Sequence, residues 1–189
     1  GLQQQLAAGN NTNATGAGSL RQAILDANGD AGHDTIDFSV SGAIVLTDAL
    51  PAIDDDLTIA GPGVEQLAVS GDNAYRVFHI KSGATVTITG LTVRDGSASN
   101  GGGILSEGDL HLSAARVFSN ARGGVYVTSG SATLSGTQVV SNAGGGVSVG
   151  YSTARLNGTQ VVSNSASGDG GGVSVFYGSA TLNGTQVRN

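Results

Sequence analysis

The chain has 189 residues, of which 32 are glycine, 12% are charged and 4% are aromatic, and its formal net charge is −6. The negative charge disfavours nucleic acid and anionic membranes as partners, and no apolar run approaches the roughly 20 residues that span a bilayer. Because cysteine is absent, a disulfide framework, a thiolate metal site and a thiol nucleophile are excluded.

A polar extension, residues 1–17, precedes the one helical pattern in the chain, and we expect this extension to be loose or tied to something outside the chain. The chain begins at Gly1 without a Met or a signal-like segment, which is typical of a processed product. Residues 18–32 predict a short helix that Ser19 can cap and Gly29 can end. The residues expected on its buried face are Leu20, Ala23, Ile24 and Ala27.

Residues 33–82 contain strand patterns of uneven length. The segments "DTIDF", "AIVLTDAL", "DLTIAG", "QLAVSG" and "RVFHI" alternate apolar with polar residues and are separated by Gly, Pro or Asp turns. When strands stack on one another, the first layer leaves an apolar surface that needs a cover. We therefore expect the preceding helix to lie over this first layer.

Residues 83–189 repeat a pattern about 22 residues long. Gly-Gly pairs recur at spacings of 21, 22 and 26 residues, and an aliphatic position recurs at spacings of 24, 22, 22 and 26. Each unit contains three short segments in which apolar and polar residues alternate, as in strands with one buried face. The aliphatic position holds Ile88, Leu112, Leu134, Leu156 and Leu182, and the Gly-Gly pairs precede Ile104, Val125, Val147 and Val173.

A period of two inside a period of about 22 predicts an all-β fold, a parallel β-helix or β-solenoid. The coils would stack about 4.8 Å apart, with the aliphatic positions directly over one another inside. We expect one domain over residues 18–189 with six or seven coils. It would comprise the capping helix at 18–32, irregular coils over 33–82 and regular coils over 83–189.

The repeated Ser-Asn and Gly-Gly pairs are expected at the corners of the coils. Asn120, Asn142 and Asn164, and Asn189 with them, can form an internal ladder of side-chain amides that hydrogen-bond from coil to coil. The alternative is that they are ordinary turn asparagines in the left-handed conformation. The glycines are expected to adopt positive φ where the chain turns into the next strand.

At these residues the sequence resembles a known class of protein. "GSLRQAILDANGDAGHDTIDF", "LTIAGPGVEQLAVSGDN" and "VTITGLTVRDG" resemble the entry segment of secreted bacterial right-handed parallel β-helix proteins. "GGGI", "VFSN" and "GGVYV" are similar to the GGA(I/L/V) and FxxN repeats of chlamydial-type polymorphic outer-membrane proteins, which build autotransporter passengers and surface stalks. The FxxN pattern holds only from Phe118 to Asn120, because Val140 and Val162 replace the aromatic residue.

Right-handed β-helices also include polysaccharide lyases and hydrolases, so we searched the sequence for clustered carboxylates. Asp54, Asp55 and Asp56 are consecutive, and alternate residues of a strand share a face, so at most Asp54 and Asp56 could act together. A solvated turn is the simpler interpretation of this run, and likewise of Asp34 and Asp37 beside His33. His79 and His111 fall on the outward phase without a carboxylate column beside them, which indicates solvated surface.

One arrangement of carboxylates in the sequence could bind a cation. Asp72, Asp95 and Asp109 lie near turns of successive coils and could converge on Ca²⁺, although we expect no cofactor.

A flat array of Thr side chains would indicate ice binding, but the outward column Thr87, His111, Thr133, Arg155, Thr181 is interrupted twice. We therefore expect no catalytic residue and no ice-binding face.

The outward side of the third segment predicts an interface. Phe118, Val140 and Val162 would form an apolar stripe beside a column of polar side chains, and such a stripe suits lateral packing against a partner. The alternative is that these three side chains fold into the corner. The flanking column includes Gln138, Gln160 and Gln186.

We therefore expect a non-catalytic structural module, secreted or on a bacterial cell surface, that serves as a stalk, an adhesin segment or a filament subunit. Its partners would be another copy, another surface protein or a glycan, with no nucleic acid and no membrane insertion. The alternative is a polysaccharide-active enzyme or a carbohydrate-binding β-helix. Because "TLNGTQVRN" stops within a repeat, we expect either further chain beyond residue 189 or docking at this end.

Overall fold

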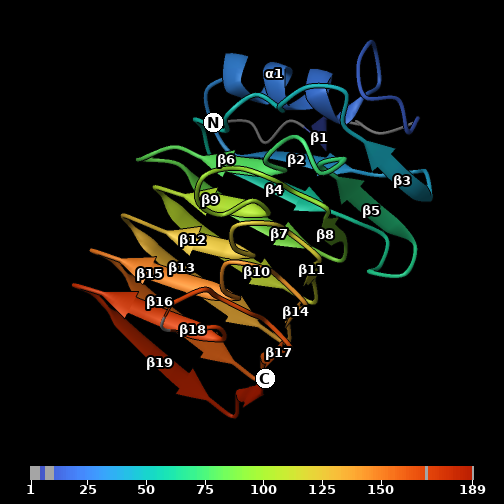
Figure 1. Cartoon of the computed structure of the whole chain (residues 1–189). Coiled ribbons are helices and arrows are strands. Elements are labelled where there is room, and N and C mark those ends of the chain that lie inside the picture. Colours follow the sequence, from blue (N-terminus) through green and yellow to red (C-terminus); the bar gives the residue numbers. More distant parts are fainter. Residues whose placement is uncertain (1–4, 7–10, 169, 189) are drawn as a thin grey trace.

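The computed structural model describes residues 5–6, 11–168 and 170–188. Twenty short strands wind into a stack of coils, and one helix, α1 (Leu20–Gly29), lies at the N-terminal end of the stack (Figure 1). All strand pairs are parallel, and each strand pairs with the equivalent strands of the coils before and after it. This is the predicted parallel β-helix.

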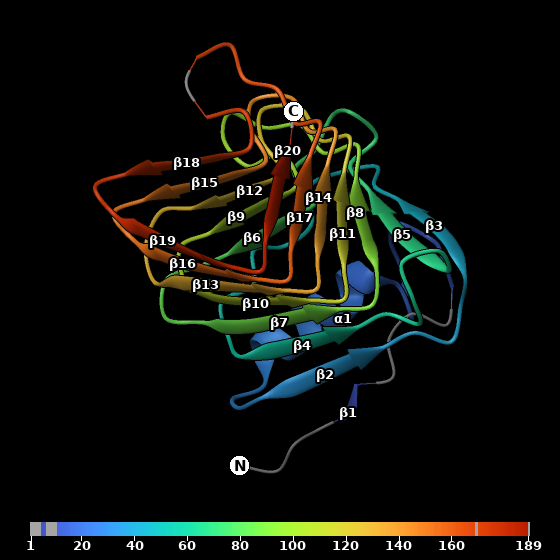
Figure 2. The ribbon, with the colours of Figure 1, turned by 90° about the horizontal axis from the view of Figure 1, so that it is seen from below.

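Each coil has three sides, and the equivalent sides of successive coils form three parallel sheets (Figure 2). Sheet A consists of β1 (Gln5–Leu6), β2 (Asp34–Asp37), β4 (Leu57–Ala60), β7 (Thr85–Thr89), β10 (Asp109–Ser113), β13 (Ser131–Ser135), β16 (Thr153–Asn157) and β19 (Ser179–Asn183). Sheet B consists of β3 (Gly42–Val45), β5 (Leu67–Ser70), β8 (Thr92–Arg94), β11 (Arg116–Phe118), β14 (Gln138–Val140), β17 (Gln160–Val162) and β20 (Gln186–Arg188). Sheet C consists of β6 (Phe78–Ile80), β9 (Ile104–Ser106), β12 (Val125–Val127), β15 (Val147–Gly150) and β18 (Val173–Phe176).

The coil count agrees with the expectation of six or seven. Ile53 forms a single bridge with Ile80 and so supplies the third side of the first coil. Six coils therefore close, and β19 and β20 begin a seventh. The predicted 22-residue register is confirmed, because Leu112 pairs with Ile88 on one side and with Leu134 on the other.

The core is a set of apolar columns inside the coils. Ile88, Leu112, Leu134 and Leu156 lie over one another and are all fully buried. Valines from sheets B and C close the other two sides of the core. Leu182, in the last described coil, continues the column in register but is 42% exposed.

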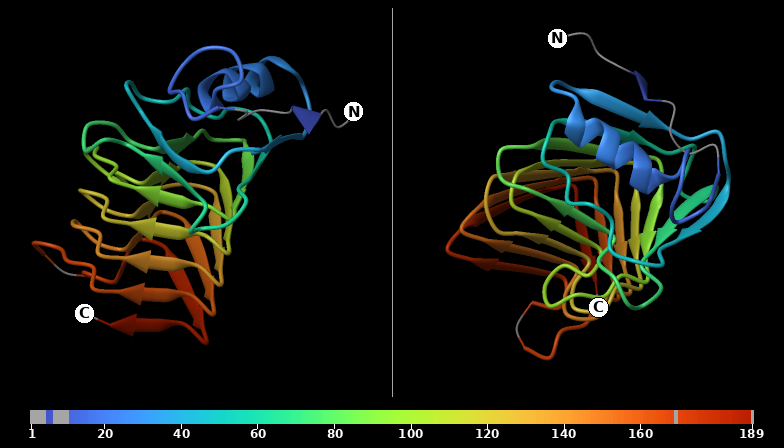
Figure 3. Two further views of the ribbon diagram at one scale, coloured as in Figure 1. Left: turned by 90° about the vertical axis from the view of Figure 1, so that its right-hand side faces the viewer. Right: turned by 90° about the horizontal axis from the view of Figure 1, so that it is seen from above.

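Helix α1 covers the first coil, as predicted, and lies across the end of the stack when it is viewed from above (Figure 3). Ser19 is its N-cap, and the Ser19 hydroxyl accepts a hydrogen bond from the Gln22 amide at 3.2 Å. The four predicted buried-face residues, Leu20, Ala23, Ile24 and Ala27, are at most 3% exposed.

The extension before the helix differs from the expectation of a loose segment. Gln5 and Leu6 form β1, which pairs in parallel with Thr35 and Ile36 of β2. The backbone groups at the edge of sheet A are thereby hydrogen-bonded, which is how exposed sheet edges are protected from pairing with other chains.

Within the described ranges, no helix has the length and apolar character needed to cross a membrane.

The corner between sheets B and C holds the predicted amide ladder. The Asn120 Nδ2 donates to the Asn142 Oδ1 at 2.9 Å, and the Asn142 Nδ2 donates to the Asn164 Oδ1 at 2.9 Å. All three side chains are at most 3% exposed. Asn189, the next expected member, lies outside the described residues.

The explanation for the glycine pairs needs a correction. The first glycine of a pair has positive φ at Gly123 (108°) and Gly145 (104°), as expected, but not at Gly102 or Gly171. The second glycine does not, and it is required instead by close packing of the coils. A Cβ on Gly124 would lie 2.8 Å from the Gly146 carbonyl oxygen and 2.9 Å from the Asn142 Nδ2.

Candidate binding surfaces on the outside of the coils

A groove of about 550 Å³ runs along the outer face of sheet B. One wall is the loop between β4 and β5, which is held against the sheet because the Thr92 hydroxyl donates to the Val64 carbonyl at 2.8 Å. The side chains of Arg94, Arg116 and Phe118 line the other side. The groove is therefore built by a loop of the irregular coils and by outward residues of two later strands.

The charged groups of this groove are held by their neighbours. The Arg116 guanidinium lies over the Phe118 ring, 4.7 Å from its centroid, and its Nη1 is 3.6 Å from the Glu65 carboxylate. The Arg116 Nε is buried and has no hydrogen-bond partner in the described part of the chain. Arg94 donates to the Asp95 carboxylate at 2.8 Å. Each guanidinium group is therefore balanced by a carboxylate, and Arg116 covers one face of the Phe118 ring.

The predicted interface stripe borders this groove. Phe118, Val140 and Val162 pair in register and are half-buried. They are therefore neither fully solvent-facing nor fully folded into the corner. The glutamines of the flanking column, Gln138, Gln160 and Gln186, are exposed, and packing of this face against a partner stays a prediction.

The three aspartates considered for a cation site are not brought together. Asp95 follows β8 in sheet B, and its carboxylate accepts hydrogen bonds from Arg94 and Ser70. Asp109 begins β10 in sheet A and accepts from the Ser131 hydroxyl at 2.7 Å. Asp72 is exposed in the turn after β5. The described residues contain no group of three or more His, Asp or Glu side chains arranged to hold a metal ion.

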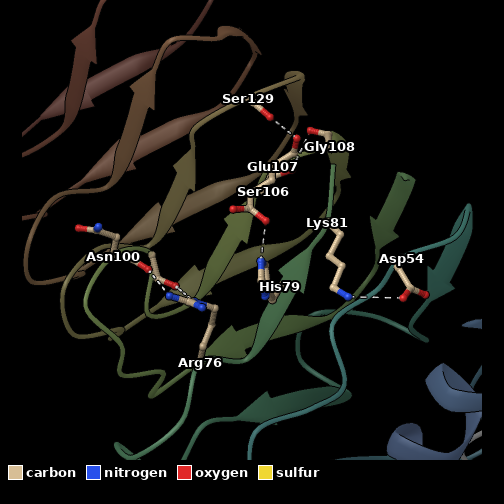
Figure 4. Close-up of polar contacts among 10 residues, drawn as sticks. Asp54, Arg76, His79, Lys81, Asn100, Ser106, Glu107, Gly108 and Ser129 are labelled. Atoms are coloured by element: carbon tan, nitrogen blue, oxygen red, sulfur yellow. Dashed lines mark hydrogen bonds and ion pairs between the residues drawn. The ribbon is translucent and has the colours of Figure 1, made fainter. Parts of the chain in front are cut away.

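A polar network lies on the outer face of sheet C near the first coils (Figure 4). The His79 Nε2 is 3.0 Å from the Glu107 carboxylate, so the expectation that no carboxylate accompanies His79 is wrong. The two residues are 28 apart, and Glu107 belongs to the turn after β9, so the strand alternation did not place it beside His79. His111 is exposed on β10.

Arg76 lies beside this pair and supports the neighbouring loop. Its Nη2 donates to the Asn100 carbonyl at 2.9 Å and its Nε to the Gly101 carbonyl at 3.2 Å (Figure 4). Burial lowers the pKa of Arg76, and the Glu107 carboxylate opposes this shift. Arg76 is thus held by backbone carbonyls, and His79 with Glu107 is the pair in this network that joins an imidazole to a carboxylate.

The run of three aspartates is structural. Asp54 forms an ion pair with Lys81 at 3.6 Å (Figure 4). The Asp55 carboxylate accepts from the Gly32 amide at 3.3 Å, and the Asp56 carboxylate accepts from the Thr85 amide at 2.6 Å. These contacts join the loop after the helix, the first coils and β7 to one another, so they do not leave two carboxylates facing a common ligand.

Asp34 is the one buried carboxylate among the residues considered. It begins β2, is 3% exposed, and its Oδ2 has no hydrogen-bond partner among the described residues. Burial raises the pKa of Asp34, and the nearby carboxylates of Asp30 and Asp55 raise it further, while His33 opposes them. Asp34 points toward the inside of the first coil, so it is not part of a surface site.

Comparison with known proteins agrees with this architecture. A search of curated proteins found no match, and a search of solved structures also found none. The family model described as "Right handed beta helix region" matches residues 35–189, which is more than half of the chain. Enzymes are also known in this fold family, so membership does not by itself define the activity. The chain belongs to the right-handed β-helix family.

Proposed function

We propose that the chain is a non-catalytic structural module of a secreted or cell-surface bacterial protein, in which it forms a rigid rod. The observation that supports this role best is the continuous register of all three sheets together with the buried ladder of Asn120, Asn142 and Asn164. A coil that slipped by one residue would turn its apolar columns outward and leave buried amides unpaired. The stack therefore resists bending and sliding.

Among structural roles, the geometry supports a stalk or an adhesin segment better than a head-to-tail filament. Helix α1 buries Leu20 and Ile24 completely against the first coil. The last coil of another copy would therefore meet the helix rather than an open layer of strands. Self-association or contact with another surface protein would instead use the side of the rod, through the stripe of Phe118, Val140 and Val162.

The test for this function is an assay for polysaccharide cleavage by the full chain. Incubation with a panel of neutral and acidic polysaccharides is expected to release no reducing ends and no unsaturated sugars. Release of either product would overturn the non-catalytic role. Because His79 with Glu107 is the acid–base pair of the polar network, Glu107→Gln is the variant that shows whether such activity arises there.

A further inference from the structure

The corner between sheets C and A, where β15 leads into β16 and β18 into β19, carries an exposed aromatic pair. Tyr151 is 72% exposed and Tyr177 is 84% exposed. Their rings stack with centroids 5.1 Å apart and an angle of 15° between the planes. In a chain with only 4 Tyr and 4 Phe, two solvent-facing stacked rings form an unusual apolar feature, and such features mark binding sites.

Both tyrosines are held in a backbone conformation that tyrosine rarely adopts. Their φ angles are 52° and 51°, in the left-handed region that disfavours bulky side chains. The corner fixes them there: the Tyr151 amide donates to the Phe176 carbonyl at 2.9 Å, and the Ser152 hydroxyl donates to the Val127 carbonyl at 3.1 Å. Other coil corners hold non-glycine residues in the same conformation, such as Ser141 (56°) and Ser163 (54°), so the fold itself imposes it on the two tyrosines.

Two further aromatic residues lie next to this pair. Phe176 is 55% exposed and pairs with Gly150 of β15. A Cβ on Gly150 would lie 3.3 Å from the Tyr126 hydroxyl oxygen, so Tyr126 reaches across Gly150 from the coil before. Four of the eight aromatic residues of the chain therefore gather around one buried glycine.

A groove of about 240 Å³ adjoins Tyr126 and Phe176 on the outer face of sheet C. Its lining includes Ser148 and Ser174, whose hydroxyl oxygens are 3.0 Å apart, and Arg122. None of its described lining residues is acidic. The groove is smaller than the roughly 300–1,000 Å³ of sites for drug-sized ligands, which suits a single ring-sized unit.

We propose that this corner and its groove bind a glycan. Tyr177 of the following coil covers one face of the Tyr151 ring. In the preceding coil the residue in register with Tyr151 is Ser129, so no ring from that coil covers the other face. A sugar residue stacks its apolar C–H face on that free ring face. The neighbouring sugar lies in the groove, where its hydroxyl groups hydrogen-bond to Ser148 and Ser174.

The lining favours a glycan over a protein partner. A protein hot spot is a dry pocket of large side chains, whereas this groove offers small hydroxyl groups and glycine backbone beside the rings. Because the described lining residues carry no carboxylate, the lining accepts neutral sugars, and Arg122 can pair with a uronate. This site goes beyond the structural role proposed above, and it stands or fails independently of that role.

The test is a binding screen of the full chain against neutral and uronate-containing oligosaccharides. Because the chain contains no Trp, its intrinsic fluorescence comes from tyrosine and reports a sugar stacked on these rings. Tyr151→Asn removes the ring while keeping a residue that tolerates positive φ. It should weaken binding by about tenfold or more without lowering the stability of the fold. Phe176→Ser should weaken binding as well, and Ser39→Ala, at an exposed position after β2, is the control that should not.

Binding of either class of oligosaccharide that is lost in both aromatic variants and kept in the control supports the proposal. Failure of every oligosaccharide to bind at millimolar concentration would overturn it. Equal affinity of the wild type and the two variants would overturn it too. If no glycan binds and Tyr151→Asn instead abolishes self-association in sedimentation experiments, the patch is a protein interface and the glycan site is wrong.

Discussion

The irregular and the regular coils connect their layers with different chemistry. Of the 14 acidic residues, ten lie before residue 83, and a carboxylate can join neighbouring coils there, as Asp56 does by accepting a hydrogen bond from the Thr85 amide. In the regular coils the same task falls to amides such as Asn142, which both accepts and donates. A carboxylate can only accept, whereas an amide can do both. An amide ladder can therefore continue through any number of coils. A carboxylate cannot donate a hydrogen bond, so it cannot extend such a ladder to the next coil.

The most direct way to break this distinction is to put a carboxylate into the ladder. In Asn142→Asp the new oxygen would replace the Nδ2 that donates to the Val117 carbonyl and to the Asn164 Oδ1. A buried, uncompensated charge facing two acceptors should lower the free energy of unfolding by about 3–5 kcal/mol. Urea unfolding measures this loss.

The matched control is Asn157→Asp, in an Asn pair at the outer end of β16. The Asn157 Oδ1 accepts from the Asn183 Nδ2 at 2.9 Å in an exposed position, so the cost there should stay within about 0.5 kcal/mol. Equal losses in the two variants would contradict the role given to the buried ladder.

The second prediction compares two glycines of the regular coils. A Cβ on Gly146 would lie 2.7 Å from the Gly172 carbonyl oxygen and 2.9 Å from the Asn164 Nδ2, whereas a Cβ on Gly136 meets nothing within 4 Å. Gly146→Ala should therefore destabilise by about 2–3 kcal/mol through overpacking. Gly136→Ala should cost about 1 kcal/mol, because its φ of 57° is its only obstacle. Thermal unfolding of both variants measures the difference, and a reversed order would show that coil spacing adjusts freely.

The third prediction concerns the cap over the irregular coils. Ser19→Ala removes the acceptor for the Gln22 amide and a donor to the Gly16 carbonyl. It should lower stability by about 1 kcal/mol. Hydrogen exchange should speed up in α1 and β2 but not in β13 or β16, because coils contact only their neighbours. Ser39→Ala, at an exposed position, is the control; uniform acceleration along the chain would mean that the coils unfold as a single unit.

Much of the fold was predictable because the same contacts recur in every coil, so the residues that make them recur in the sequence about every 22 residues. The columns of Ile88 and its equivalents and the Asn ladder follow from residue types at this fixed spacing, and the helix follows from its own capping residue and apolar face. Features that occur once left no such signal: Glu107 reaches His79 from a turn, and the loop carrying Val64 forms the groove wall only because of one bond to Thr92.

Two missed features did carry a signal in the sequence. Thr137 and Thr159 follow glycine in each "GTQVV" unit, and their buried hydroxyls donate to the Leu112 and Leu134 carbonyls at 3.1 and 3.0 Å. Their recurrence could have indicated a second polar contact between coils, at the corner of sheets A and B. The recurrence of Tyr151 and Tyr177 at equivalent places could likewise have indicated their stacking, but their left-handed backbone could not be read from residue type.

The last and smallest effect tests the buried carboxylate of the first coil. Because the pKa of Asp34 is raised in the folded chain, the folded state holds a proton that the unfolded state has lost. Stability should therefore fall as the pH rises from about 3.9, the ordinary carboxyl value, through the higher folded-state pKa. Asp34→Asn should flatten this pH dependence. Above the folded-state pKa of Asp34, the variant should be at least as stable as the wild type.

Urea unfolding at a series of pH values measures this dependence. Asp34→Glu, which keeps an ionisable group at the same place, is the comparison that should retain the fall in stability. If the asparagine variant kept the same slope, the dependence would arise from other groups of the irregular coils. In that case the buried Asp34 carboxylate would not lower the stability of the first coil. The difference between the irregular and the regular coils would then depend only on the Asn ladder.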